Sequence, residues 1–222
     1  MGKRIIQQRR GRGTLTYRVP EKSFTPKIEY KDKPGRVADI LKNPLANSPV
    51  AQIVYDDNTK GFVIAPEGMK IGDAVQGFVK AAAEVSEGTI VSAIETYPYS
   101  GPKLCRAPGS FAILVSKTQK ECTIQLPSKK TKRINLQCRV TLGIPAGEGA
   151  KEKPLIKAGN KYHRAHARGK LYPRTSGGAM NAVDHPYGGG YTGLGKPKSV
   201  SRHAPPGRKV GSLSPKRTGK RK

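Results

Sequence analysis

The sequence predicts a mainly β protein in which an ordered middle is flanked by two long basic extensions. Between residues 36 and 150, short apolar runs recur, several of them rich in β-branched residues, and clusters of turn-forming residues separate them. Outside that span the apolar runs stop, and Lys, Arg, Gly and Pro dominate. Regular short strands joined by Gly/Pro turns are typical of small barrels. The middle is therefore expected to form one sandwich or two small barrels.

Each apolar run of the middle is a candidate strand, because it is short and ends at a turn signal such as Asp56-Asp57-Asn58. Residues 73–84 also allow a helix, which Gly72 and Gly77 disfavour. We place a domain boundary near residue 84, so the first barrel covers residues 36–83 and the second covers residues 84–150. The candidate strands are residues 37–41, 50–55, 61–65, 74–79, 89–94, 111–116, 122–126, 133–136 and 139–144.

The two extensions, residues 1–35 and 151–222, have the composition of segments without a core of their own. Residues 1–36 carry 11 Lys/Arg against 3 Asp/Glu, residues 37–150 carry 13 against 10, and residues 151–222 carry 18 against 2. Gly and Pro make up 19 of the last 72 residues. Such chains bury too little apolar area to offset the entropy lost on folding. We expect both extensions to be extended and to order against a partner.

The formal charge of +27 makes a polyanion the expected partner. Nucleic acid is favoured, because each phosphate that Lys or Arg neutralises releases counterions. A membrane is not expected, since we find no amphipathic or lipidation signal and no apolar run near the ~20 residues of a spanning helix. Three cysteines without a Cys-x-x-Cys pair, and no signal-peptide core, indicate a reduced compartment, the cytoplasm.

RNA is favoured over DNA as the nucleic acid. No recognition helix or zinc finger is evident in the sequence, as a reader of the DNA major groove would normally need. Small β barrels are common RNA-binding platforms, and basic Gly-rich extensions suit threading into a folded RNA.

The most distinctive segment is residues 176–190, which packs Asp184, His185 and five glycines into fifteen residues. Asp184 and His185 would suit acid–base chemistry, but neighbours in sequence usually point apart and the segment lacks a rigid scaffold. The glycines 188–190 permit close approach of main-chain amides to an anion. No Gly-Lys-Ser/Thr follows them, which excludes a P-loop. We interpret the segment as one positioned within RNA, with a simple flexible loop and catalysis by the pair as the alternatives.

Two basic runs also have alternative interpretations. His163 and His166 are two candidate zinc ligands, but no pair of cysteines completes a site. Their run, residues 161–170, is basic and is expected to face phosphates, and histidine also stacks on bases. The run at residues 129–133 lies between two candidate strands. It is either a solvated hairpin tip or a cationic RNA contact, and the charge of the whole chain favours the contact.

Several motifs, in order along the chain, resemble the L two family of large-subunit ribosomal proteins. The most specific is residues 180–190, Met-Asn-Ala-Val-Asp-His-Pro-Tyr-Gly-Gly-Gly. The other matching segments are residues 11–13, 64–68 with 72–73, 126–128, 137–139, 157–160 and 201–209. They are spread along nearly the whole chain in the order that the family has them.

The resemblance implies an OB-like barrel followed by an SH3-like barrel, with long extended basic tails. It implies direct binding to large-subunit rRNA beside other ribosomal proteins, a C-terminal tail that reaches toward the peptidyl-transferase region, and support for subunit association and tRNA binding. It implies no enzyme activity, no small-molecule substrate, no protein-bound metal and no cofactor, and any bridging Mg²⁺ would be held by rRNA. The candidate RNA-binding residues are Arg4, Arg9, Arg10, Arg12, Lys103, Arg106, Lys129, Lys130, Arg139, Lys157, Lys161, His163, Arg164, Arg168, Lys170, Arg174, Asn181, Asp184, His185, Gly188, Gly189, Gly190, Lys196, Lys198, Arg208 and Lys209.

The chain also departs from the bacterial form of the family. Tyr187 stands where bacterial members have a second histidine, and Ala182 replaces a bacterial proline, which is similar to the archaeal and eukaryotic branch. One RNA-contact arginine of the family falls on Arg106, but another falls in residues 45–47, which contain none. A free nucleic-acid packaging protein is the alternative function, since the basic tails alone would serve it.

Overall fold

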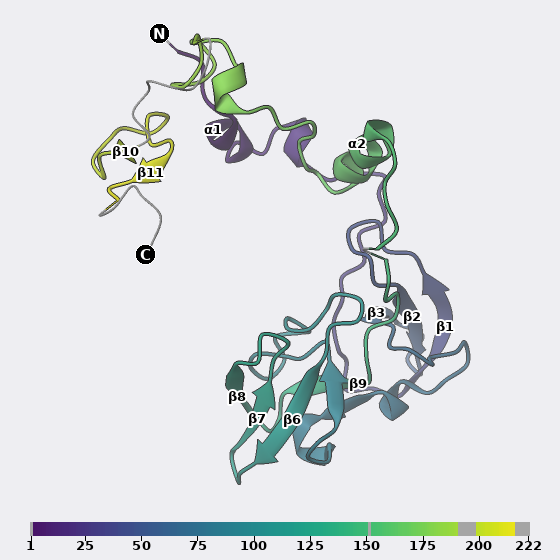
Figure 1. Cartoon of the computed structure of the whole chain (residues 1–222). Helices are drawn as coiled ribbons and strands as arrows, with labels where there is room; N and C mark the ends of the chain where they lie inside the picture. Colours follow the sequence, from purple (N-terminus) through teal and green to yellow (C-terminus); the bar gives the residue numbers. More distant parts are fainter. Residues whose placement is uncertain (1, 151, 191–198, 216–222) are drawn as a thin grey trace. The chain divides into compact units, whose positions relative to one another are not determined.

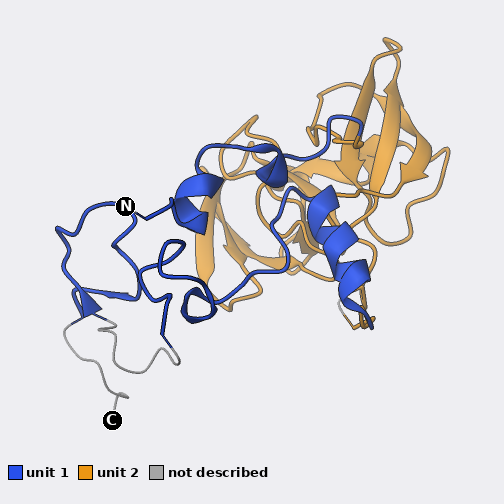
Figure 2. Ribbon diagram, turned by 90° about the horizontal axis from the view of Figure 1, so that it is seen from above, with its two compact units in different colours: residues 1–22, 156–222 blue, residues 23–155 orange. Residues whose placement is uncertain are grey.

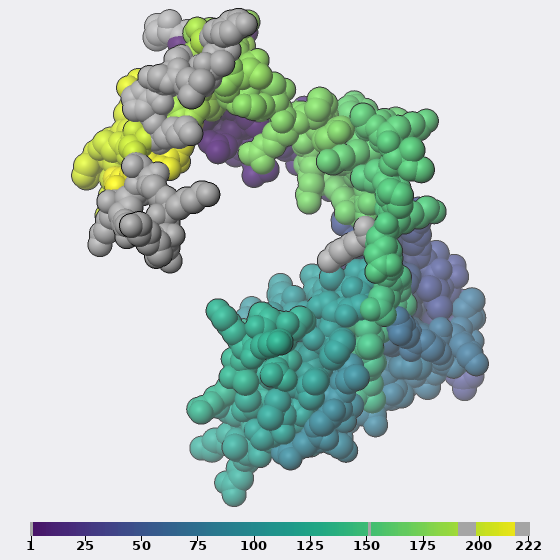
Figure 3. All heavy atoms as spheres, in the orientation of Figure 1, coloured from purple at the N-terminus to yellow at the C-terminus, as the bar shows by residue number. Residues whose placement is uncertain are grey.

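The computed structural model describes residues 2–150, 152–190 and 199–215 (Figure 1). The chain divides into two compact units (Figure 2). We call residues 23–155 the barrel unit, and residues 1–22 with 156–222 the tail unit. In the space-filling view the barrel unit, mostly blue and teal, forms one continuous body (Figure 3).

The first sheet of the barrel unit has three antiparallel strands in the order β1-β2-β3. They are β1 Gly35–Leu41, β2 Val50–Tyr55 and β3 Lys60–Ile64. Asn58, at φ 58°, reverses the chain between β2 and β3 and donates its N–H to the Tyr55 carbonyl at 2.8 Å. A Cβ on Gly61 would stand 2.7 Å from the Tyr55 ring, so glycine at this position lets that ring pack against β3.

The second sheet has six strands in the order β4-β9-β5-β6-β7-β8, all paired antiparallel. The 3-10 helices η2 Val75–Gly77 and η3 Ala82–Glu84 flank β4. The strands are β4 Val79–Ala81, β5 Ile90–Ser92, β6 Ala112–Lys117, β7 Glu121–Gln125, β8 Thr131–Asn135 and β9 Arg139–Leu142. The two curled sheets confirm the expected fold, which is mainly β with an OB-like barrel followed by an SH3-like barrel.

Each sheet has its own apolar cluster. One gathers Val37, Ile53, Tyr55 and Val63 of the first sheet with residues around it, and the other gathers side chains such as Leu114 and Ile124 of the second. These side chains are almost fully buried, and truncating such a leucine or isoleucine to alanine typically costs about 2–5 kcal/mol. The barrel unit is therefore held by its own core.

Every predicted strand overlaps an observed one, but residues 74–79 do so only at Val79. There the chain forms η2 instead, because Gly77 and Phe78 donate their N–H groups to Ala74 and Val75 in a tight turn. The alternative helix over residues 73–84 is absent, since β4 separates η2 from η3. β4 pairs with β9 although the sequence assigns it to the first barrel. The boundary near residue 84 stays a prediction.

The tail unit is built from short elements joined by irregular chain. These are α1 Ile6–Arg10, η1 Leu15–Tyr17, α2 Ala158–Ala167, η4 Gly177–Ala179 and a parallel pair of two-residue strands, β10 Ser199–Val200 and β11 Ser212–Leu213. Within the described ranges, Ile5 is its one buried apolar side chain. No helix among those ranges is long and apolar enough to cross a membrane.

Helix α2 is the main element that the sequence analysis did not anticipate. Its residues include good helix formers such as alanine, lysine and arginine. Gly169, at φ 60°, ends it, donating its N–H to the His166 carbonyl while Lys170 donates to that of Ala165. This pair of bonds satisfies two carbonyls of the last turn.

Candidate nucleic-acid interface

The loop at residues 180–189, which we call the tail loop, is closed by its own main chain. The N–H groups of Asp184 and His185 donate to the Asn181 carbonyl at 3.0 and 3.3 Å. Gly188 donates to the His185 carbonyl at 2.8 Å, and Gly189 donates to that of Met180 at 3.1 Å. These amides are used inside the loop, so the loop reaches a defined shape without an anion bound to them.

The glycines of residues 176–190 let backbone and ring approach each other closely. A Cβ on Gly188 would lie 2.2 Å from the Asn181 carbonyl oxygen. A Cβ on Gly177 would lie 2.4 Å from the His185 ring. Both positions are therefore closed to any side chain, and the structural use of these glycines is internal packing.

Asp184 and His185 do not act on each other in the way that an acid–base pair requires. Nδ1 of His185 accepts the N–H of Tyr187 at 3.0 Å, and the two rings meet edge to face with centroids 5.3 Å apart. The proton of a neutral imidazole then sits on Nε2, which leaves that atom as a donor. The Asp184 carboxylate lies 3.8 Å from the cationic groups of Lys3 and Arg9.

The N-terminal residues 2–10 pack against the tail loop. The N–H of Lys3 donates to the Val183 carbonyl at 2.7 Å, and Ile5 is buried at 6% exposure. A cavity of about 370 Å³ opens beside this contact and is lined by Lys3, Arg4, His185 and Arg208 among others. Most of this lining is basic or neutral, so the cavity favours an anion or an uncharged group.

Helix α2 carries a second basic cluster. Burial, and then the nearby charge of Arg164, lower the pKa of the Arg168 guanidinium. Such repulsion between neighbouring cations is relieved when phosphates approach. Within the described residues, no group of three or more His, Cys, Asp or Glu side chains that could hold a metal ion is found around His163 and His166.

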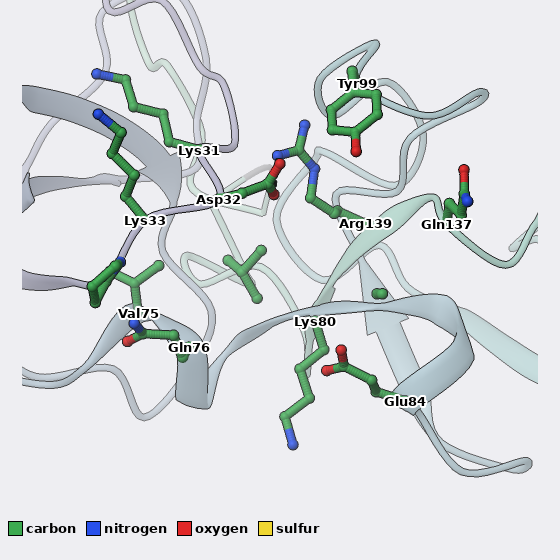
Figure 4. Close-up of a pocket in the computed structure, with 13 residues that line it drawn as sticks. Lys31, Asp32, Lys33, Val75, Gln76, Lys80, Glu84, Tyr99, Gln137 and Arg139 are labelled. Atoms are coloured by element: carbon green, nitrogen blue, oxygen red, sulfur yellow. Dashed lines mark hydrogen bonds and ion pairs between the residues drawn. The ribbon is translucent and has the colours of Figure 1, made fainter.

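Arg139, predicted to contact RNA, is engaged inside the barrel unit. Its guanidinium bonds to the fully buried Glu95 at 3.0 Å. It also bonds to Asp32 at 2.7 Å and lies 5.0 Å from the ring centroid of Tyr99 (Figure 4). Burial alone would lower the pKa of Arg139, but Glu95 and Asp32 hold it above its usual value. The side chain is 11% exposed, so an RNA contact by Arg139 stays a prediction.

The other predicted RNA-contact cations of the barrel unit lie in loops. Lys129, at φ 63°, and Lys130 form the turn between β7 and β8, where the N–H of Lys129 donates to the Leu126 carbonyl at 2.8 Å. Lys103 and Arg106 follow β5 on the irregular crossing to β6, and the Arg106 carbonyl accepts the Ser48 hydroxyl at 3.0 Å. All four residues are exposed.

The predicted RNA-contact residues are mostly at the surface. Arg139, Arg164, Arg168, Asp184 and His185 are half-buried, and Gly188 is buried. Lys196 and Lys198 lie outside the described residues. The exposed ones are Arg4, Arg9, Arg10, Arg12, Lys103, Arg106, Lys129, Lys130, Lys157, Lys161, His163, Lys170, Arg174, Asn181, Gly189, Gly190, Arg208 and Lys209.

Lys3 and the tyrosines around α2 are not among the residues predicted from the sequence. Lys3 is one more cation in a basic run, and its partner Asp184 is far away in sequence. Tyr162 and His166 are four residues apart, which places them on one face of a helix once the helix is recognised.

Comparison with known proteins identifies the family. Residues 2–77 match the model described as Ribosomal Proteins L2, RNA binding N-terminal domain, and residues 76–209 match the corresponding C-terminal domain. The chain belongs to the ribosomal protein L2 family. The two models together cover most of the chain, as the motifs of the sequence analysis predict.

Full-length relatives agree with this assignment. A protein of Methanothermobacter thermautotrophicus named large ribosomal subunit protein uL2 is 44% identical, with all of both chains covered. Proteins with the same name from Methanococcus aeolicus and Haloarcula marismortui are also 44% identical, the latter over 99% of this chain and 98% of its own length. These relatives are archaeal, which agrees with the branch predicted from Tyr187 and Ala182.

Proposed function

We propose that this protein is a structural component of the large ribosomal subunit that binds large-subunit rRNA directly. Family membership supports this role, and so does the distribution of charge. The tail unit carries 23 Lys/Arg in sequence against two acidic residues, Glu21 and Asp184. A unit with this excess of cations and almost no core needs a polyanion around it.

The geometry of the tail loop gives the strongest structural support for RNA binding. Its main chain is closed, its one carboxylate is taken up by Lys3 and Arg9, and Nε2 of His185 is left as a donor. Arg4 and Arg208 line the cavity beside it. We infer that the loop presents a fixed shape and a surrounding positive charge to folded RNA.

The finer parts of the proposal follow the family resemblance. The C-terminal tail would reach toward the peptidyl-transferase region and support subunit association, tRNA binding and peptide-bond formation indirectly. The protein itself would not be an enzyme, because Asp184 and His185 are held by different partners. It would work in the cytoplasm, within the ribosome and beside other ribosomal proteins.

Binding to rRNA across a salt series tests the main proposal. The full chain should bind large-subunit rRNA more tightly than a random RNA of equal length at every salt concentration, and both affinities should fall as salt rises. Equal affinity for the two RNAs would instead favour a free packaging protein.

The non-enzymatic role of His185 has its own test. We expect His185→Ala to impair particle assembly or placement of the tail, because it removes the ring that packs against Gly177 and Tyr187. Assembled mutant particles with a normally placed tail but no peptide-bond formation would contradict this expectation.

A further inference from the structure

A second cavity of the tail unit lies between the N-terminal extension and helix α2. We call it the aromatic pocket. It measures about 310 Å³, and its walls include Leu15, Tyr162, His166, Lys170 and Tyr172. Four of its lining residues come from η1 and α2, and α2 is the green helix labelled in Figure 1. None of the residues that line the pocket lies in the sequence motifs that resemble the family.

The rings of the pocket form a stacking surface. Tyr162 and His166 are stacked with centroids 6.2 Å apart and planes 23° from parallel, and Tyr162 is 48% exposed. Lys161 lies 5.0 Å from the ring centroid of Tyr172. Leu15 is 84% exposed and adds an apolar edge at the mouth. Flat, exposed rings beside cations are the features with which proteins bind single-stranded RNA bases.

Close main-chain packing fixes the two walls against each other. A Cβ on Gly169 would lie 2.8 Å from the Arg18 carbonyl carbon, so the end of α2 touches the chain just after η1. Gly169 also has φ 60°, which glycine adopts without strain. The pocket is thus built before any ligand enters it.

The charge of the lining distinguishes this pocket from a cavity of the barrel unit. That cavity, of about 480 Å³, is lined by the carboxylates Asp32 and Glu84 together with Lys31, Lys33, Lys80 and Arg139 (Figure 4). Arg139 already bonds to Asp32. The aromatic pocket has no carboxylate in its lining, and Lys170 is part of it. A phosphate beside the aromatic pocket would therefore meet cations without a competing negative charge.

We propose that the aromatic pocket receives one unpaired base of the rRNA, stacked on Tyr162, with Lys161 and Lys170 neutralising the phosphates on either side. This inference rests on the proposed function. It adds a contact in which the protein stacks on a base, beside the contacts in which its cations attract the charged RNA backbone. An unpaired base is required, because the rings offer a flat face and a base within a helix presents only its edges.

The test compares four full-length proteins in binding to large-subunit rRNA over a salt series. They are the wild type, Tyr162→Ala, Tyr162→Phe and, as a matched control, Tyr97→Ala, which removes an exposed tyrosine of the barrel unit. Loss of one stacked base should lower the affinity of Tyr162→Ala by roughly 5- to 150-fold. The dependence of log affinity on log salt should keep its slope, since no phosphate contact is removed. Tyr162→Phe keeps the ring and should bind as the wild type does, as should Tyr97→Ala.

Ultraviolet cross-linking of the wild-type complex gives a second readout, in which mass spectrometry should find a nucleotide attached to Tyr162 or Tyr172. If the wild type binds large-subunit rRNA selectively but Tyr162→Ala binds equally well, the pocket proposal is wrong and the rRNA-binding function stands. If Tyr162→Phe binds rRNA as weakly as Tyr162→Ala does, the interaction at Tyr162 is not stacking. If the wild type shows no selectivity, the proposed function itself fails.

Discussion

The barrel unit buries two apolar clusters, whereas in the described ranges the tail unit contributes only Ile5 to the buried apolar side chains. In sequence, the barrel unit has 19 Lys/Arg against 13 Asp/Glu, and the tail unit has 23 against 2. Main-chain hydrogen bonds and glycines at close approach give the tail unit its local shape. The comparison shows that stability and RNA recognition can be divided between two parts of one chain. The barrel unit has the apolar core that stabilises the fold, and the tail unit has the excess of positive charge that attracts RNA.

The strongest test of this separation is to break the buried ion pair of the barrel unit. Glu95→Ala leaves the Arg139 guanidinium half-desolvated and removes the acceptor of the Gly101 and Arg139 main-chain N–H groups. We expect the free energy of unfolding to fall by about 3–5 kcal/mol, measured by urea denaturation.

Asp32→Ala is the matched control, because Asp32 bonds the same guanidinium but its side chain is 63% exposed. It should cost less than ~1 kcal/mol. Equal losses for Glu95→Ala and Asp32→Ala would show that burial does not govern the energetics of this network.

A change in the tail loop should affect RNA binding and leave the barrel unit intact. In Gly188→Ala the new methyl group would clash with the Asn181 carbonyl, 2.2 Å away, and would open the loop. Overpacking of this kind costs roughly 1–3 kcal/mol, so we expect rRNA affinity to fall about 5- to 150-fold in a filter-binding titration. The urea midpoint of the barrel unit should not move.

Gly178→Ala tests whether that effect comes from the clash. The nearest atom to a Cβ at Gly178 is the Ser176 hydroxyl at 3.8 Å, an ordinary contact. Its affinity should match the wild type. A large loss with Gly178→Ala would mean that flexibility, and not close packing, is what the glycines supply.

The smallest expected effect separates charge from backbone strain in the hairpin between β7 and β8. Lys129 has φ 63°, a region that favours glycine, so Lys129→Gly should stabilise the barrel unit by up to ~1 kcal/mol. If Lys129 contacts a phosphate, the same change should reduce the salt slope of rRNA binding by roughly 0.7–0.9. Lys129→Ala should reduce the salt slope of rRNA binding by the same amount without the gain in stability. If neither variant changes the slope, the hairpin tip is solvated and does not contact a phosphate.

The strands were predictable from sequence because their signals are local. β-branched runs such as residues 50–55 end at turn residues such as Asn58, and neither feature depends on distant parts of the chain. The run at residues 74–79 failed as a strand because the turns around Gly72 and Gly77 outweigh its apolar residues. Composition likewise predicted a tail without a core.

The contacts of the candidate site were less predictable, because they join residues far apart in sequence. Nothing local marks Lys3 as a partner of Asp184, or Glu95 and Asp32 as partners of Arg139. Arg139 looks like other surface arginines until the fold buries Glu95 beside it. The resemblance named His185, but the acceptor role of its Nδ1 needs the turn that brings the Tyr187 amide to it.

The contact between Lys3 and Val183 has a consequence for the order of events during synthesis. The N-terminal residues leave the ribosome early, and the tail loop that receives them is translated near the end of the chain. Until then Lys3 and Arg9 lack their carboxylate, and any RNA they meet is held by charge alone. The contact can form only after residue 184 has been translated, so a chain truncated before the tail loop has both barrels but cannot pair its N-terminal residues with that loop.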